Sequence, residues 1–380
     1  MNYIKLGQAI SRAKVSRCGD NDFPVLSITM KDGIVMQSDK FKKRIASKDI
    51  SEYKVIPAGM LVQGIHMDEG NFGIQDIVPY GIVSPAYTVW TVDESVVFPK
   101  YIEMVLRSPR CIDYYRSKLN GTVNRRGHMS EGDFLGMQIP CPSIEEQKHV
   151  VTTMNQVKQV MISLTEEMTA LDQLIKARFV EMFGDVETNP MGWRKGSLKD
   201  HASVIVGYPF PSEGYSSEGI DIVGGYNLMQ GYIQWEESKH WPSEEGFESY
   251  LLHDNDIVMA MDRPWVNGGF KIARIDVDHL PAILIQRTAC IRGKDVEQEF
   301  LYYMLDSNRF AEHCNITGSL VPHISNKDIN SYQIILPPRD EQKRFAAFVS
   351  QVDKSKLSIQ ASLDHLETLK QSLMQKYFGY

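Results

Sequence analysis

The sequence predicts an α+β protein in which two long antiparallel helices form a coiled-coil spacer between two globular regions with mixed short strands and helices. Residues 138–184 align without a gap on residues 333–379, and 13 of the 47 pairs are identical. Apolar residues recur at helical spacing in both copies, whereas short β-branched and aromatic runs fill the regions upstream of each copy. A duplicated chain of this kind makes two similar surfaces, so what it binds is expected to have two parts.

The composition permits more than one hydrophobic core. Of the 380 residues, 43% are hydrophobic and 10% are aromatic, which is enough for two or three units. The net charge of −7 argues against a protein that coats nucleic acid nonspecifically, because phosphate neutralisation requires clustered Lys and Arg. A local basic face remains compatible with this charge.

The cysteines and the amino-terminal segment indicate a cytoplasmic protein. The five cysteines are scattered and form no C-x-x-C pair, which favours reduced thiols over a zinc site or a redox motif. No basic start with an apolar stretch follows Met1, and no window approaches the roughly eighteen apolar residues of a membrane span. We expect neither export nor membrane insertion, and no bound metal.

The globular regions are predicted over residues 1–138 and 192–333. Short runs bounded by turn residues predict strands, and two more helical runs occupy comparable places in the two regions. The strand runs are 33–36, 60–62, 86–90, 256–259 and 282–285, and the helical runs are 101–106 and 300–305. The tails of the two regions also correspond, but farther upstream they diverge strongly. Similar frames with different surfaces predict two binding domains that recognise different targets.

The first long helix is predicted within residues 139–191, which also contain the connector to the second region. Ser143 and Glu146 form an S-x-x-E capping box, in which each side chain pairs with the other residue's backbone N–H. The helix is expected to end at Gly184, because the C′ position prefers a left-handed residue. Its heptad seam consists of Val157, Met161, Leu164, Met168, Leu171 and Ile175.

The second long helix is predicted within residues 334–380. Pro338 lies near the first helical position, where its missing N–H costs nothing, and Gly379 ends the helix. Lys356 and Lys370 interrupt its apolar stripe. The seam residues of this copy are Val352, Ile359, Leu363, Leu366 and Leu373.

Chain order constrains how the two helices pair. If the second helix packs back along the first, the two run antiparallel and the C-terminus returns to the N-terminus. This gives a pseudo-twofold, nearly circular arrangement around a rod of about 60 Å, because each of about 40 residues adds about 1.5 Å. Each seam could instead pair with another chain. Pairing within the chain is favoured because tethering raises the effective concentration of the partners.

No catalytic residue is predicted in this chain. An amino-methyltransferase needs an Asn/Asp-Pro-Pro-aromatic loop, and the nearest match, residues 189–191, lacks the second proline and the ring, so it is read as a turn. A G-x-x-x-x-G-K-[ST] phosphate loop is absent from the sequence. Adjacent side chains diverge, so His313 and Cys314 are better explained by a packed thiol than by nucleophilic chemistry.

Two P-x-x-x-E-Q stretches, residues 142–147 and 337–342, each open a long helix. Together with the stretches 189–193 and 318–325, their repeated order resembles the specificity subunit of Type I restriction-modification systems over essentially the whole chain. The resemblance implies two target recognition domains, each reading one half of a bipartite double-stranded DNA site. It also implies a noncatalytic subunit whose helices set the spacer and dock two methyltransferase (modification) subunits.

The same resemblance implies where the chemistry resides. The methyltransferase partners would use S-adenosylmethionine to methylate adenine, and restriction motor and nuclease subunits would use ATP and Mg, while this chain binds no cofactor. The helix seams would serve both helix packing and partner binding. This chain starts almost at once with its first globular region, at residues 3–6. That leaves open whether a short N-terminal helical segment completes the central region.

Candidate DNA contacts follow from residue type. Arg suits bidentate contacts to guanine and Asn suits adenine, whereas Lys more often meets phosphate. The candidates of the first region are Lys42, Lys43, Arg44, Asn124, Arg125, Arg126 and His128. Those of the second region are Arg263, Trp265, Asn267, Ser319, His323 and Lys327. Any one of them could be a solvated surface group, so the hypothesis concerns the clusters.

Two other classes of function stay open. A two-headed scaffold could bind protein or carbohydrate ligands at either end of a coiled coil, and the net acidity would suit it. A self-contained enzyme with an unrecognised site is disfavoured, because each half lacks a convincing nucleophile, metal cluster or cofactor loop.

Overall fold

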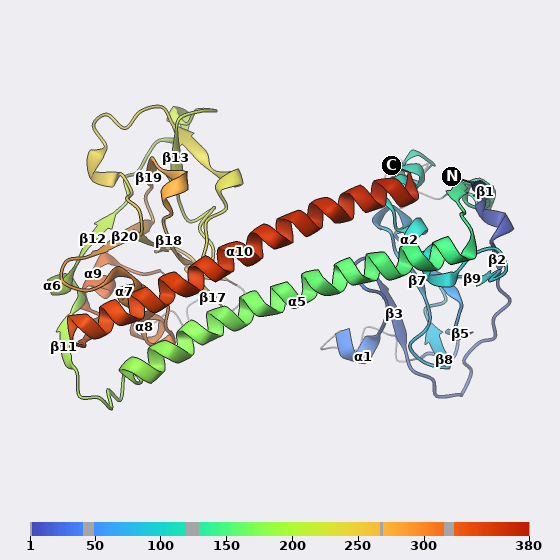
Figure 1. The fold of residues 1–380 in the computed structure, drawn as a ribbon, viewed down its shortest axis with the longest axis horizontal. Helices are drawn as coiled ribbons and strands as arrows, with labels where there is room; N and C mark the ends of the chain where they lie inside the picture. The colour runs from blue at the N-terminus through green and yellow to red at the C-terminus, as the bar shows by residue number, and fades with distance from the viewer. Residues whose placement is uncertain (1, 41–48, 119–128, 267–268, 315–322, 380) are drawn as a thin grey trace. The chain divides into compact units, whose positions relative to one another are not determined.

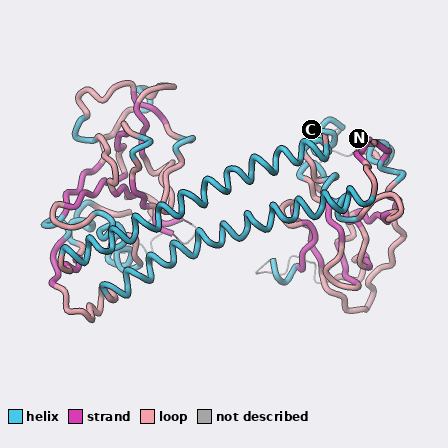
Figure 2. Tube along the Cα trace, in the orientation of Figure 1, coloured by secondary structure: helices cyan, strands magenta, loops and turns pink. Residues whose placement is uncertain are grey.

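The computed structural model describes residues 2–40, 49–118, 129–266, 269–314 and 323–379. Helices and strands mix throughout the chain, as expected of an α+β fold (Figures 1 and 2). Contacts divide the chain into two compact units. Unit 1 consists of Met1–Thr165 and Gln360–Tyr380, and unit 2 consists of Glu166–Ile359. The long helices α5 (Ile144–Phe183) and α10 (Arg339–Phe378) therefore each contribute residues to both units.

Unit 1 is built around a four-stranded antiparallel sheet. The order of its strands is β2 (Ile10–Arg12), β9 (Thr88–Val92), β6 (Leu61–Gln63) and β7 (Phe72–Ile74). The separate antiparallel pairs are β1 (Tyr3–Lys5) with β10 (Gln138–Pro140), β3 (Leu26–Thr29) with β4 (Gly33–Met36), and β5 (Lys54–Pro57) with β8 (Tyr80–Val83). The short helices of the described part are α1 (Gln37–Lys40), α2 (Pro99–Leu106), α3 (Pro109–Lys118) and α4 (Glu131–Gly136).

Aromatic side chains fill the core of unit 1. The ring centroid of Phe134 lies 5.8 Å from that of Phe72 and 5.3 Å from that of Trp90. Phe378, near the end of α10, is buried in the same core and lies 5.9 Å from Tyr101. Because large aromatic rings bury much apolar surface, this cluster ties the sheet, α2, α4 and the end of α10 together.

Unit 2 repeats this frame. Its main antiparallel sheet has the order β12 (Ala202–Val206), β20 (Thr288–Gly293), β15 (Ile257–Ala260) and β18 (Ile272–Arg274). β11 (Arg194–Ser197) pairs with β21 (Gln333–Leu336), as β1 pairs with β10. The short helices are α6 (Leu198–His201), α7 (Gln298–Leu305), α8 (Asn308–His313) and α9 (Asn326–Ser331).

The two units differ outside the shared frame. Unit 2 carries a three-stranded sheet in which β13 (Ile220–Val223) pairs antiparallel with β14 (Lys239–Trp241) and parallel with β19 (Ala282–Leu284). It also carries a hairpin of β16 (Trp265–Val266) and β17 (Gly269–Phe270). The segments predicted as strands and helices from sequence appear within one or two residues of their predicted ends.

The ends of the long helices follow the local signals. Ser143 Oγ accepts a hydrogen bond from the Glu146 N–H (3.3 Å), and Glu146 Oε2 accepts one from the Ser143 N–H (2.9 Å), which confirms the capping box. The bonds from Ser143 lower the pKa of Glu146. Gly184 and Gly379 have φ angles of 76° and 66°. Both helices therefore end at a left-handed glycine, as predicted.

The heptad seams are the covered faces of the helices within each unit. Val157 and Ile175 are buried, and the other four seam residues of α5 are half-buried. In unit 2 Asp172 pairs with Lys356 (2.6 Å), and the ring centroids of Phe183 and Phe345 are 5.5 Å apart. Residue numbers rise along α5 while those of its neighbours on α10 fall, so the two helices run antiparallel there. On α10, Val352 and Ile359 are buried and Leu363, Leu366 and Leu373 are half-buried.

The two lysines on the α10 stripe pair with carboxylates. Lys356 reaches Asp172 of α5, and Lys370 lies 3.0 Å from Glu367 of its own helix. An ion pair between two helices, such as Lys356–Asp172, contributes little to the free energy of unfolding when it is exposed, but it fixes the register of the helices. The Lys356 pair therefore helps to set how α5 and α10 align in unit 2.

Candidate nucleic-acid interface

Most of the candidates predicted from sequence lie outside the described residues. In the first region this holds for Lys42, Lys43, Arg44, Asn124, Arg125, Arg126 and His128, and in the second for Asn267 and Ser319. The structure places the other four, which are Arg263, Trp265, His323 and Lys327. All four belong to unit 2, so the description of a site begins there.

Three of them gather at one end of the main sheet of unit 2. Strand β15 finishes at Ala260 and strand β20 begins at Thr288, and because the two are antiparallel these ends meet. The Met261 N–H donates to the Arg287 carbonyl (2.8 Å), and the Ile324 N–H donates to the Met261 carbonyl (2.8 Å). These two bonds pin three distant segments together. We call this place the β15 end, defined by Asp262, Arg263, Trp265, Arg287 and His323.

Asp262 links two cationic or polar side chains at the β15 end. Its Oδ1 is hydrogen-bonded to Nδ1 of His323, and its Oδ2 lies 3.1 Å from Nε of Arg287. The side chains of Arg287 and His323 are 73% and 57% exposed, against 33% for Asp262. The carboxylate is thus the more covered member, with two exposed nitrogen-bearing groups held over it.

Arg263 directly follows Asp262 in the chain, and Trp265 lies two residues further on. Arg263 is exposed and has a φ of 46°, a left-handed conformation that few non-glycine residues adopt. Trp265 opens the β16–β17 hairpin opposite Phe270 and is 38% exposed. A partly exposed indole next to guanidinium groups can stack on a base.

Lys327 lies on α9, the helix that follows His323. Ser325 caps this helix: its Oγ accepts from the Asp328 N–H (3.2 Å), and Asp328 Oδ2 accepts from the Ser325 N–H (2.8 Å). The hydrogen bond from Ser325 lowers the pKa of Asp328. The cap orients the first turn of α9, which presents Lys327 to solvent.

Asp262 and Arg287 were not among the residues singled out from sequence. Arg287 directly precedes the buried strand β20, and Asp262 lies two residues beyond the end of the buried strand β15. That placement is a signal a sequence offers, since charges at strand ends mark the rim of a sheet. The pairing of Asp262 with Arg287 and His323 cannot be predicted from spacing, because these partners lie 25 and 61 residues away from Asp262 in the sequence.

The equivalent end of the unit 1 sheet has a different surface. β6 pairs with β9 and β7 just as β15 pairs with β20 and β18. Gln63 ends β6 and accepts a hydrogen bond from the Trp90 indole (2.8 Å). After buried Gly64 come Ile65, which is 63% exposed, and exposed His66. Among the described residues, the two units therefore share a frame and present different groups at the same place.

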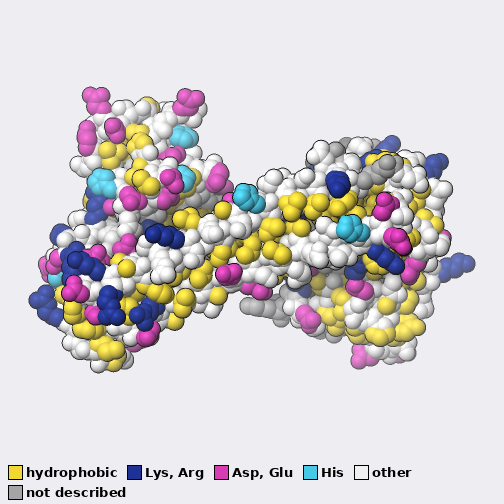
Figure 3. All heavy atoms as spheres, viewed as in Figure 1, with side chains coloured by type: hydrophobic (Ala, Val, Ile, Leu, Met, Phe, Trp, Pro, Cys, Tyr) yellow, Lys and Arg dark blue, Asp and Glu magenta, His cyan; other side chains and the backbone are white. Residues whose placement is uncertain are grey.

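Another part of unit 2 is unsuited to DNA. Residues 208–256 contain ten Asp and Glu and one Lys. Figure 3 shows acidic side chains spread over the part of unit 2 that carries β13 and β19. Because these charges repel phosphate, nucleic acid is expected to avoid this part of the unit.

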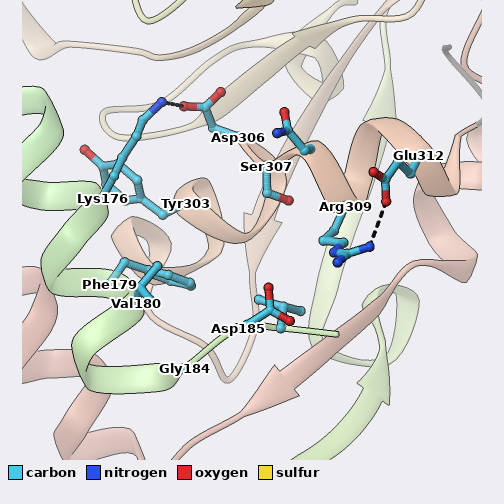
Figure 4. A pocket seen from close by; sticks show the side chains of 12 residues that line it. Lys176, Phe179, Val180, Gly184, Asp185, Tyr303, Asp306, Ser307, Arg309 and Glu312 are labelled. Carbon is cyan, nitrogen blue, oxygen red and sulfur yellow. Dashed lines mark hydrogen bonds and ion pairs between the residues drawn. The ribbon is translucent and has the colours of Figure 1, made fainter. Parts of the chain in front are cut away.

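A groove of about 480 Å³ lies between the end of α5 and the α7–α8 turn of unit 2 (Figure 4). Lys176 faces Asp306 (3.3 Å), and Arg309 faces Glu312 (2.9 Å). Since each basic group in its wall has an acidic neighbour, the groove offers no single-sign field to a phosphate backbone. The Lys176–Asp306 pair links α5 to the end of α7, whereas the Arg309–Glu312 pair lies within α8.

Other sequence expectations can be placed in the described residues. Asn189 has a φ of 45° and bonds through its side chain to both the N–H and the carbonyl of Trp193 (2.9 and 2.7 Å), which confirms a turn. All five cysteines are buried and unpaired, and burial raises the pKa of each thiol, for Cys314 to about 12. These thiols are therefore poorly reactive.

Within the described ranges, no group of three or more His, Cys, Asp or Glu side chains is placed to hold a metal ion. The described helices include none with the length and apolar character needed to cross a membrane.

Residues 192–368 match the family described as the Type I restriction modification DNA specificity domain. Over 170 residues, 43% of this chain, the sequence is 34% identical to the Type I restriction enzyme EcoAI specificity subunit of Escherichia coli. Over 266 residues, 65% of this chain, it is 24% identical to the MjaVIII specificity subunit of Methanocaldococcus jannaschii. The aligned stretches span 28% and 62% of the length of these relatives.

Solved structures share the fold. A chain from a study of complex assembly and conformational transition of the type I R-M system has a TM-score of 0.60 at 16% identity, covering 99% of this chain and 97% of the other. The Type I restriction-modification S subunit from M. genitalium has a TM-score of 0.56 at 13% identity, covering 100% and 96%. At these identities the likeness concerns the fold. Residues 192–368 of this chain therefore match the Type I restriction modification DNA specificity domain, and the chain as a whole shares the fold of these solved structures.

Proposed function

We propose that this chain is the noncatalytic DNA-specificity subunit of a Type I complex and that each unit reads one half of a bipartite target. The observation that carries the proposal is the shared strand order of the two units combined with their different exposed groups. The β15 end of unit 2 presents Arg287 and His323, whereas the matching place in unit 1 presents Ile65 and His66. Two recognition units with the same strand order and different surface groups suit a DNA target with two dissimilar halves.

The long helices are proposed to set the spacing of the two half-sites. Support comes from the continuity of each helix over 40 residues and from its contribution to both units. A continuous helix has a fixed rise of about 1.5 Å per residue, so the length of the helix can set the distance between the two DNA half-sites. The predicted domain division at residues 138, 191 and 333 belongs to this proposal.

The exposed apolar residues of α5 and α10 are proposed to dock the methyltransferase subunits, together with the half-buried parts of the seams. Figure 3 shows hydrophobic side chains along the visible surfaces of both helices. Helical apolar groups left open to water favour a partner helix. The exposed ones are Val160, Ile162, Leu174, Val180, Leu357 and Leu369.

The partners are proposed to supply the chemistry. S-adenosylmethionine would be bound by the modification subunits, and ATP and Mg by the restriction subunits. Nothing in the catalytic cycle is assigned to a side chain of this chain, whose contribution is binding and placement of DNA.

A two-headed protein-binding scaffold is the second candidate. The acidic segment 208–256 favours it, because ten carboxylates against one lysine suit a basic protein surface better than DNA. The two candidates differ in a single observable, which is sequence-specific methylation.

Genome-wide methylation mapping tests the proposal. Cells would express the chain together with its candidate methyltransferase, with matched cultures that express either protein alone. The expected result is methylated adenine in a motif of two short specified parts separated by a nonspecific spacer, seen only when both proteins are present. Methylation that is absent, or confined to one continuous motif, would refute the bipartite reading.

A further inference from the structure

Resting on the function proposed above, we propose that Arg287 reads a guanine in the half-site bound by unit 2 and that Asp262 and His323 position it. Arg287 was not among the sequence candidates. The inference starts from its place at the β15 end, where the backbone bonds of Met261 hold the segments of Arg287 and His323 beside Asp262.

The ion pair leaves the reading face of Arg287 accessible. Asp262 Oδ2 lies against Nε of the guanidinium at 3.1 Å, and the side chain as a whole is 73% exposed. The terminal Nη groups therefore stay accessible, and these are the donors that reach guanine O6 and N7 in the major groove. A guanidinium held from one side loses less freedom on binding than a free one does.

His323 completes the support of Asp262. It occupies Oδ1 through Nδ1, so the two carboxylate oxygens face two different nitrogen donors. An acidic group at a DNA surface would otherwise repel the backbone, but here its charge is shared between an arginine and a histidine. Asp262 can thus approach DNA as part of a neutralised cluster.

The backbone at this place is strained without a gain in stability. Arg287 and Arg263 have φ angles of 65° and 46°, and Asn255 and Asn189 are the other non-glycine residues with positive φ among those described. A left-handed arginine costs on the order of a 5-fold to 150-fold change in the folding equilibrium. An ion pair to a side chain as exposed as Arg287 returns little of that. A strained and exposed arginine that stabilises so little points to function.

The chemistry favours a base over a phosphate. Arginine binds guanine through a planar, bidentate fork, whereas a lysine meets a phosphate equally well as a point charge. Asp262 and His323 restrict the direction of the fork. Restriction of direction matters for reading a base edge and matters little for a phosphate, which accepts charge from many angles.

Two substitutions of Arg287 separate reading from folding. Arg287→Gly removes the fork and also relieves the left-handed strain, so its thermal midpoint should equal or exceed that of the original chain. Arg287→Lys keeps the charge and loses the fork. Arg194→Ala is the matched control, because it removes an exposed arginine from β11 in the same unit, away from the β15 end.

The measurement uses the full chain assembled with its methyltransferase. The half-site is first mapped, and duplexes are then made in which each guanine of that half-site is replaced by the other three bases. Arg287→Gly and Arg287→Lys should both lower discrimination at one and the same guanine by roughly 10- to 100-fold, the range of one bidentate contact. Asp262→Asn should relax the same position by a smaller factor, and Arg194→Ala should relax none.

Each other outcome is decisive. If Arg287→Lys keeps full discrimination while Arg287→Gly weakens binding equally on all duplexes, the contact is to phosphate and the inference fails. If discrimination survives in both variants, Arg287 reads nothing. If the unsubstituted complex shows no bipartite motif at all, the proposed function fails first, and this result is distinguishable from the other two.

Discussion

Gln147 and Gln342 make the same two hydrogen bonds, one glutamine in each unit. Gln147 Oε1 accepts from the Phe98 N–H (2.7 Å) and its Nε2 donates to the Pro142 carbonyl (2.8 Å). Gln342 Oε1 accepts from the Glu297 N–H (2.9 Å) and its Nε2 donates to the Pro337 carbonyl (2.9 Å). Both are buried. The glutamine of each P-x-x-x-E-Q stretch thus locks the start of a long helix to the start of α2 or α7.

Replacing either glutamine by methionine should destabilise its own unit. Gln147→Met leaves the Phe98 N–H without its partner, at a cost of about 1–3 kcal/mol for a buried unpaired donor. Hydrogen exchange of the intact chain measures it. Amides of α2 should exchange faster in Gln147→Met, and those of α7 in Gln342→Met. The two variants control each other, and faster exchange throughout the chain in either one would contradict the assignment.

Alanine at the helix-terminal glycines should cost stability unequally. The left-handed conformation alone costs an L-residue about 1–2 kcal/mol. A Cβ at Gly184 would lie 2.6 Å from the Pro190 ring, whereas one at Gly379 would meet the hydroxyl of Tyr3 at 2.8 Å. A side-chain tip can move more easily than a proline ring. Denaturant unfolding should rank Gly184→Ala as the more destabilised, and the reverse order would show that Pro190 yields freely.

The cap of α9 should make stability depend on acid pH. The hydrogen bond from Ser325 lowers the pKa of Asp328 below its ordinary value of 3.8. A lowered folded pKa means that the stabilisation is present above pH 3.8 and is lost as the pH falls through the folded value. Asp328→Asn should therefore be less stable than the original chain at pH 7, with the gap closing in acid. Thermal midpoints between pH 7 and pH 3 test it; a gap that does not change with pH would exclude this origin.

Removing one heptad from each long helix should shorten the preferred DNA spacer. Deleting residues 161–167 together with 361–367 leaves the Asp172–Lys356 and Phe183–Phe345 contacts of unit 2 in place. Methylation across a library of spacer lengths reports the preference. Deleting only one of the two segments disturbs the pairing and serves as the control. An unaltered spacer preference in the double deletion would defeat the ruler proposal.

Arg125→Ala with Arg126→Ala should weaken binding to one half-site only. These two arginines lie outside the described residues, so the expectation rests on their spacing and charge. Binding to duplexes with one scrambled half-site measures the effect, and the Arg287 variants provide the comparison for the other half. Unchanged methylation of the cognate duplex at limiting enzyme would count against the pair.

Local signals in the sequence were sufficient for the long helices. A capping box, a heptad stripe and a terminal glycine each act within a few residues, so Ser143, Ile175 and Gly184 take up the roles their neighbours dictate. The sequence did not predict that Gln147 is buried and hydrogen-bonded. Its partner is a backbone N–H 49 residues away, and a backbone group leaves no trace in a side-chain pattern.

The candidate site was readable only in part. Arg263, Trp265 and His323 were chosen for residue type and loop context, and the structure brings them to one end of the sheet. The sequence did not predict Asp262 and Arg287 as part of the site, because their contact depends on the antiparallel register of β15 and β20. Strand register is a long-range property that spacing along one chain does not encode.

The division of α5 and α10 between the units has a consequence for synthesis on the ribosome. All residues of unit 2 lie within one continuous stretch that ends at Ile359, whereas unit 1 still lacks Gln360–Tyr380 at that point. Phe378 fills the unit 1 core beside Tyr101, and it is made after the whole of unit 2. Unit 1 is therefore started first and completed after unit 2, and a ribosome that stalls before Phe378 would release a chain with a complete unit 2 and an incomplete core in unit 1.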